Sequence, residues 1–250
     1  MVDIHELNTL PIHTRKPKAP ESTELIYSDG RCSEIKFLNS LINKRVVIVG
    51  PAGYLQEQGK GDWIDTFDIV VRVNHAIPIK YPEDYGTKTD ILYHILSHRG
   101  SSNKVLIEEE EIDLWAEQKV DWLVTSHSAI SQRVKEIGPL IKNKLKWACV
   151  HHRFSNKIKQ QISRKSPNTG ILAIAHLLSS RLQSLTVVGF DLYQSGVYEG
   201  YGDLRENEDA LEVNTRWHDI HAQMEFLRRL SYKEKYRLIL DDVLKGILGV

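Results

Sequence analysis

Residues 45–53 read R-V-V-I-V-G-P-A-G, and this stretch is the strongest indicator of the fold. Its first five residues include a β-branched run, which is typical of a fully buried parallel strand. Gly50 and Gly53 bound a tight turn of the kind that leads from a strand into a helix. Such turns let backbone amides and a helix terminus approach a phosphate, so the stretch predicts a nucleotide-binding α/β fold. The alternative is a structural turn without a ligand.

A second strand with a polar end follows this turn. Residues 68–75 read D-I-V-V-R-V-N-H, and we expect a strand over residues 68–73. Asn74 then lies where an α/β sheet presents side chains to its crevice, and an amide there can bind phosphate or ribose. Arg72 and Asp68 alternate on the strand, and a structural ion pair between them is the alternative to a functional role.

Strand and helix patterns alternate along the rest of the chain. We expect an α/β fold: a mostly parallel sheet with helices on both faces, Rossmann-like, with ligands outside the carboxyl ends of the strands. Residues 194–212 have no period and predict a binding segment or a mobile lid. The further predicted strands are 90–96, 122–126, 147–150 and 185–190, and the predicted helices are 108–118, 131–142, 169–182 and 217–230.

Length and composition limit the class of protein. The 250 residues are 41% hydrophobic, which suits one domain over residues 36–250 behind an N-terminal arm at 1–35. Basic and acidic residues number 33 each, so we expect no nucleic-acid partner. Residues 1–20 contain no apolar run, which predicts a cytoplasmic protein without a stable membrane anchor. Cys32 and Cys149 lack zinc-type spacing, so we expect free structural thiols.

The segment Asn168-Thr169-Gly170 opens an apolar helical pattern. Free backbone amides and the positive end of the helix dipole at such a start suit a phosphate or a carboxylate. Ordinary capping by Asn168 or Thr169 is the alternative, and capping does not exclude ligand binding.

A group of histidines lies in the last predicted helix. His218 is placed near the helix start, where a neutral imidazole can serve as a general base near pH 7. His221 and Glu225 are four residues apart and share a face. Surface histidines without a role are one alternative. A zinc hydrolase is another, and it would need further ligands such as His94 with His98 or His151 with His152.

Together these segments resemble the animal-type sialyltransferase family, in the form of a short soluble bacterial or viral-like member. The long motif of that family, V-V-G-N-S-G, D-x-V-x-R-x-N-H and G-x-x-T, is similar to residues 46–53, 68–76 and 86–89. Its short motif, P-S-T-G with an apolar helix and a strand ending in G-F-G, is similar to residues 167–170 and 189–191. Its final His-Asp and Glu-Phe-Leu resemble residues 217–227.

The resemblance implies a Rossmann-like, single-domain glycosyltransferase of a GT-A-like variant. Such an enzyme moves sialic acid, or the related acid Kdo, from its cytidine monophosphate (CMP) ester to a hydroxyl of a glycan or glycolipid, with inversion and without a metal or cofactor. CMP-sialic acid and CMP-Kdo share the leaving group and the anomeric carboxylate, so a Kdo transferase is an alternative. A non-catalytic nucleotide- or glycan-binding protein of the same fold is another.

The resemblance also implies roles for individual residues. His218 is the expected base, with His221 as the competing choice. Asn74 and the Asn168-Thr169-Gly170 turn are expected to hold the cytidylate. The remaining substrate-binding residues implied are Gly50, Ala52, Gly189, Phe190, Tyr198 and Tyr201.

Four positions depart from the family pattern. Pro51 replaces an asparagine that contacts the nucleotide, and Asn168 replaces a serine. The two linked cysteines of the family fall on Val46 and near Ser180, so that disulfide cannot form. A second histidine that steadies the departing phosphate falls near residues 198–201, where only Tyr198 and Tyr201 are offered.

Overall fold

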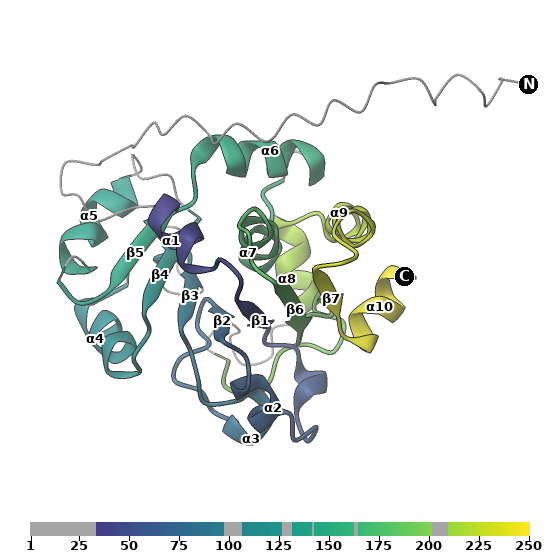
Figure 1. Cartoon of the computed structure of the whole chain (residues 1–250), viewed down its shortest axis with the longest axis horizontal. Coiled ribbons are helices and arrows are strands. Elements are labelled where there is room, and N and C mark those ends of the chain that lie inside the picture. The colour runs from purple at the N-terminus through teal and green to yellow at the C-terminus, as the bar shows by residue number, and fades with distance from the viewer. Residues whose placement is uncertain (1–33, 98–106, 127–131, 142, 163–164, 202–209) are drawn as a thin grey trace, which may run out of the picture.

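The described residues form one parallel sheet of seven strands, shown in Figure 1. The computed structural model describes residues 34–97, 107–126, 132–141, 143–162, 165–201 and 210–250. The strand order is β5-β4-β3-β2-β1-β6-β7, and every neighbouring pair is parallel. The strands are β1 (Arg45–Val49), β2 (Ile69–Val73), β3 (Ile91–His94), β4 (Trp122–Thr125), β5 (Lys146–Cys149), β6 (Ser184–Val188) and β7 (Leu238–Leu240).

Helices cover both faces of the sheet, as predicted (Figure 1). Alternate strand residues point to opposite faces, so Val46 and Ile48 pack into one cluster and Val47 and Val49 into another. The first face is covered by α1 (Glu34–Ser40), α6 (His152–Ile162), α7 (Thr169–Leu178), α9 (Ile220–Lys233) and α10 (Asp242–Leu248). The second is covered by η2 (Gly53–Leu55), α2 (Gly61–Asp65), α3 (Pro82–Tyr85), α4 (Glu109–Glu117) and α5 (Gln132–Ile141).

The order of the strands reverses at β1. From β1 the chain proceeds through β2 to β5 on one side, and β6 and β7 add to the other side. In open α/β sheets, ligands bind outside the carboxyl ends of the strands at such a switch point. Helices α7 and α9 each precede a strand of this sheet, so their amino termini lie at that same carboxyl edge. The topology therefore places the ends of β1 and β6 and the starts of α7 and α9 at the same edge of the sheet, where a ligand crevice is expected.

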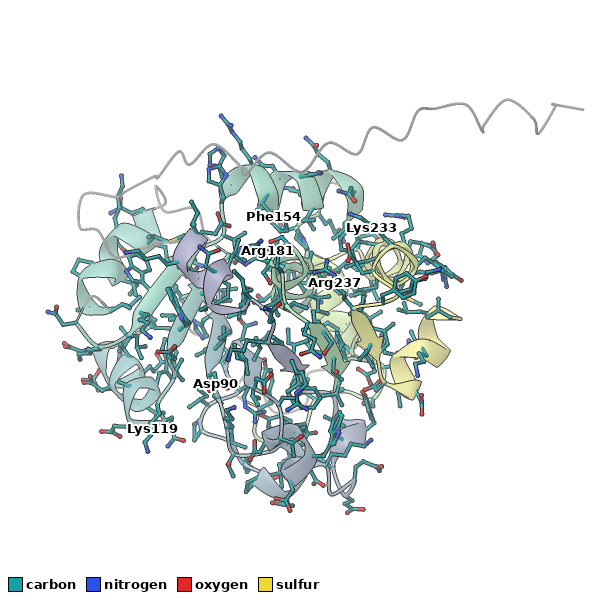
Figure 2. The ribbon with its side chains drawn as sticks, in the orientation of Figure 1. Asp90, Lys119, Phe154, Arg181, Lys233 and Arg237 are labelled. Atoms are coloured by element: carbon teal, nitrogen blue, oxygen red, sulfur yellow. The ribbon has the colours of Figure 1, made fainter. Side chains whose placement is uncertain are left out.

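The far end of α7 is held by Arg237, which is labelled in Figure 2. Its guanidinium donates to the carbonyl oxygens of Leu178 at 3.1 Å and Ser180 at 3.0 Å. These bonds satisfy acceptors that a helix end leaves open. They help to fix the helix whose other end faces the crevice.

The predicted single helix over residues 217–230 is wrong at its start. Helix α8 (Ala210–Trp217) ends at Trp217, and α9 begins at Ile220. The break arises because the Asp219 carboxylate accepts a hydrogen bond from the Ala222 amide at 2.9 Å and caps α9. His218 consequently lies in a short connection, which frees it from the orientation that a helix would impose.

Other boundaries also differ from the expectation. The helix predicted at residues 169–182 ends at Leu178, and the strand predicted at 185–190 ends at Val188. Helix α6 was not predicted, because its sequence is polar and buries only Ile158 and Ile162. The short β7 and α10 were missed as well. Of the predicted loop at 194–212, residues 202–209 lie outside the described residues, as do residues 1–33 of the predicted arm.

The ion pair considered between Arg72 and Asp68 does not form. Arg72 is buried and donates to the Thr89 hydroxyl at 2.9 Å and to main-chain carbonyls of the α3–β3 connection. Burial lowers the pKa of Arg72 to about 10, so it stays charged at neutral pH. Asp68 lies before the start of β2 and pairs with Arg45 of the adjacent β1 at 3.4 Å. The two residues are at opposite ends of the strand, which separates their partners.

Two smaller expectations can be checked in the described residues. Cys149 is buried, as suits a structural residue, and Cys32 lies outside them. None of the helices in the described ranges is both long and apolar enough to cross a membrane.

Candidate active site

The turns after β1 and β6 approach each other closely at the switch point. Gly189 has φ of 76°, a conformation that L side chains rarely adopt. A Cβ atom built on Gly50 would overlap the Gly189 carbonyl oxygen and contact the Phe190 ring. Both glycines are therefore required by the close approach of two backbones at the switch point.

The amides of the first turn are already engaged within the protein. Gly50 donates to the Val188 carbonyl at 2.8 Å, and Ala52 donates to the Gly189 carbonyl at 3.0 Å. The next amides, those of Gly53 and Tyr54, donate to the Gly196 carbonyl and the Ser195 hydroxyl. Each of these four amides already has an acceptor within the protein, so none is available to donate to a phosphate as expected. That Gly50 and Ala52 belong to the substrate site stays a prediction. Any contact that they make with a ligand would not be a hydrogen bond from these two amides.

The turn after β6 is held in place by Tyr54 and Asp241. The Gly189 amide donates to the Tyr54 hydroxyl at 2.8 Å, and that hydroxyl donates to the Asp241 carboxylate at the start of α10. Burial and the Asp241 carboxylate raise the pKa of Tyr54 well above its ordinary value. Gly189 therefore shapes the site rather than offering a hydrogen bond. Phe190 packs against Gly170, whose missing side chain leaves room for the ring.

The amino terminus of α7 presents a group of uncommitted donors. The Asn168 side chain caps the helix by accepting from the Ile171 amide at 2.8 Å, as its capping alternative predicted. In the described part of the chain, the amides of Thr169 and Gly170 and the Thr169 hydroxyl donate to no acceptor. The positive end of the α7 dipole adds to these donors. This turn has the chemistry to bind a phosphate or a carboxylate.

Asn74 lies at the end of β2 in a strained conformation. Its φ is 48°, in the left-handed region, and its amide donates to the Tyr93 carbonyl at 2.7 Å. Its Oδ1 atom is buried and has no hydrogen-bond partner in the described part of the chain. A buried, unpaired amide in a strained conformation at a crevice is typical of a ligand-binding residue.

The two tyrosines predicted near the phosphate are buried on the second face of the sheet. Tyr201 donates its hydroxyl proton to the Val73 carbonyl at 3.1 Å, directly before Asn74. The Tyr198 ring lies 4.7 Å from that of Tyr85 and 5.3 Å from that of Tyr201. Burial raises the pKa of Tyr198 to about 12, so its hydroxyl stays protonated. The contact of either residue with a ligand stays a prediction.

His218 is held in one tautomer by the segment before α7. Its Nδ1 atom lies 2.8 Å from the Ser166 carbonyl oxygen, which can only accept, so Nδ1 carries the proton. Its Nε2 atom then has a free lone pair and no hydrogen-bond partner among the described residues. Burial lowers the pKa of His218, and the nearby Lys165 adds to this effect. A neutral imidazole with an available nitrogen meets the requirements of a general base near pH 7.

Sequence reasoning missed Gln223. Its side chain is fully buried in α9, and its Oε1 accepts from the Asn168 amide at 2.9 Å. The available signal was a polar residue at a core position of the amphipathic α9, one turn from the buried Leu227.

The other candidate histidines in the described part of the chain lie in different surroundings. His221 is exposed on the first turn of α9, and the Glu225 carboxylate bonds to Arg228 rather than to a histidine. The His151 and His152 rings lie 4.4 Å apart at the start of α6. Among the residues that the structure describes, no group of three or more His, Cys, Asp or Glu is placed to hold a metal ion. His98 is outside that part of the chain.

Comparison with known sequences gives a consistent result. Residues 21–235 match glycosyltransferase family 29, described as sialyltransferase. The human CMP-N-acetylneuraminate-β-galactosamide-α-2,3-sialyltransferase 1 is 27% identical over 206 residues, which cover 78% of this chain. They cover 58% of the human protein, so the chain spans less than two thirds of the length of that relative.

Solved structures share the fold. A mammalian sialyltransferase is 20% identical, with a TM-score of 0.51 over 82% of this chain and 77% of its own. The Campylobacter jejuni sialyltransferase CstII, solved with cytidine-5'-monophosphate, is 16% identical, with a TM-score of 0.53 over 82% of this chain and 84% of its own.

Proposed function

This chain belongs to glycosyltransferase family 29, the sialyltransferases, and we propose that it transfers sialic acid from CMP-sialic acid to a glycan hydroxyl. One observation carries the proposal. A half-buried, neutral imidazole, that of His218, bonds to Ser166, two residues before a turn whose donors are unoccupied. A proton acceptor and an anion-binding turn thus lie side by side at the switch point, as transfer from a phosphate ester requires.

The donor is held at its phosphate by the start of α7. The Thr169 and Gly170 amides and the helix dipole face the negative charge that grows on the phosphate as CMP leaves. The side chain of Asn74, whose Oδ1 atom is unpaired, accepts a hydrogen bond from the same nucleotide at the end of β2. The neutral donors of α7 support a reaction in which no divalent ion is needed at the phosphate.

The acceptor is activated by His218. Nε2 takes the proton of the acceptor hydroxyl while the hydroxyl oxygen bonds to the anomeric carbon and the bond from that carbon to the phosphate oxygen breaks. CMP departs from the opposite side, so the configuration at the anomeric carbon inverts. The Ser166 carbonyl stabilises the imidazolium that forms, because Nδ1 continues to donate to it.

Nucleotide and donor binding test this proposal. We expect CMP to raise the melting temperature, by linkage, more than uridine or adenosine monophosphate does. CMP-sialic acid and CMP-Kdo are then compared as donors by the CMP that each releases with glycan acceptors. Equal melting shifts with all three nucleotides would contradict a cytidylate site. Transfer from CMP-Kdo alone would replace sialic acid with Kdo, and binding without turnover would leave a nucleotide-binding protein.

A further inference from the structure

Three contacts join the segment before α7 to α8, to α9 and to the connection between them. Lys165 Nζ donates to the Thr215 carbonyl at 2.8 Å, and His218 Nδ1 donates to the Ser166 carbonyl at 2.8 Å. The third joins the Asn168 amide to Gln223 Oε1 at 2.9 Å. The two segments are thus joined in the order of their sequences.

The Gln223 contact differs from the other two in its burial. Gln223 has no exposed surface, whereas the Lys165 and His218 contacts are open to solvent. Its Nε2 also reaches back to the Asp219 carbonyl at 3.4 Å, so one side chain contacts both Asn168 and the residue that follows His218. The Asp219 carbonyl also accepts from the Gln223 main-chain amide at 3.0 Å, so the buried Asn168 amide is the group that depends on this side chain. Leaving that amide unpaired is costly, so Gln223 fixes Asn168 relative to α9.

We propose that Gln223 is a positioning residue, which holds the His218 imidazole in register with the donor-binding turn at Asn168-Thr169-Gly170. The inference rests on the proposed function and deepens it. Gln223 bonds to the last residue before α7 and to the residue after His218. The distance between base and donor is therefore set by this amide.

Two substitutions separate positioning from simple packing. Gln223→Met keeps the length of the side chain but cannot accept from the Asn168 amide. Gln223→Glu keeps an acceptor oxygen and adds a negative charge. If Gln223 only filled the core, methionine would be tolerated and a buried carboxylate would be the more damaging change.

For positioning we expect the reverse order. Gln223→Met should lower kcat by up to about a hundredfold, with CMP affinity little changed, because Asn168 still caps α7. Gln223→Glu should recover most of kcat at high pH. Its acid limb should move to higher pH, because the added carboxylate favours the protonated imidazole beside the existing charges of Asp219 and Lys165.

A second readout needs no substrate. Nitrogen NMR of the His218 ring should report a proton on Nδ1 in the wild type and a mixture of tautomers in Gln223→Met. The matched control is Gln132→Met in α5, where the exposed Gln132 side chain donates to Glu136. An unchanged tautomer and an unchanged kcat in Gln223→Met would overturn the proposal. A Gln223→Glu variant that is as slow at high pH as Gln223→Met would overturn it as well. If the His218 tautomer changes in Gln223→Met but the wild type transfers no sugar, the positioning role stands and the proposed function is refuted.

Discussion

His218 is expected to be the base, and His221 is not. His218 has a fixed tautomer and an open Nε2, whereas His221 is exposed on α9. Replacing a general base costs about a hundredfold to ten-thousandfold in rate, so His218→Ala should lose that much kcat and His221→Ala should stay near the wild type. Turnover at saturating donor decides between them, once melting and CMP titration show that both variants fold and bind. An inactive His221→Ala beside an active His218→Ala would reverse the assignment.

The pH dependence follows from the environment of His218. Burial lowers its pKa, so the neutral base should persist below the ordinary imidazole value of about 6.5. We expect the acid limb of kcat to lie below that pH. The unfolded chain binds the proton more readily, so stability should also fall as the pH drops from about 6.5 through the folded pKa. The pH–rate profile of the wild type measures the first effect, and acid unfolding of the wild type and of His218→Gln measures the second. An acid limb of kcat above about 7 would contradict the burial argument.

Asn74 can be tested apart from its backbone strain. Asn74→Gly and Asn74→Ala both remove the amide, but only glycine adopts φ of 48° without strain. Both variants should lose affinity for CMP, and Asn74→Ala should melt lower than Asn74→Gly. Calorimetric titration with CMP gives the affinity, and an unchanged value in the glycine variant would remove Asn74 from the site.

At the scale of elements, the crossing of the β1 and β6 turns should tolerate no side chain. In Gly50→Ala the new Cβ overlaps the Gly189 carbonyl, and such overpacking costs about 1–3 kcal/mol. Gly246 is the matched control, because it lies inside α10 with nothing within 4 Å of a new Cβ. Gly246→Ala should stabilise the protein by about 0.5–1 kcal/mol. Denaturant unfolding measures both changes, and a neutral Gly50→Ala would contradict the close approach.

The elements that formed the sheet were largely predictable, because their sequences carry strong periodic signals. Residues 46–49 are a continuous apolar run and residues 69–73 are apolar except for Arg72. The structure places the two segments in neighbouring central strands. Helix α6 and β7 were not predictable in this way. The first buries only two apolar residues and the second is three residues long, so tertiary packing rather than local pattern defines them.

The places of the candidate residues in the fold were predictable, but their hydrogen bonds were not. The motifs indicated Asn74, Asn168 and His218, and these lie at one edge of the sheet. The occupied amides at Gly50 and Ala52 could not be foreseen, since their acceptors lie more than a hundred residues away. The break before α9 was missed because Asp219 reads equally well as an internal helix residue until its capping bond is seen.

For the whole molecule, we expect activity to survive chelators. The α7 amides and dipole supply the charge stabilisation at the phosphate, and in the described ranges no three metal-binding side chains converge. Turnover with and without a chelator, after dialysis, is the measurement. Loss of activity that zinc restores would support the hydrolase alternative built on the histidines.

The proposed transfer of sialic acid through His218 can be measured directly. The test is incubation with CMP-sialic acid and candidate glycan acceptors, followed by mass spectrometry of the glycan product. We predict a product heavier by one sialic acid residue with the wild type, and its near absence with His218→Ala that is folded and still binds CMP. Equal product from both proteins, or none from the wild type with any acceptor while CMP still binds, would contradict the account.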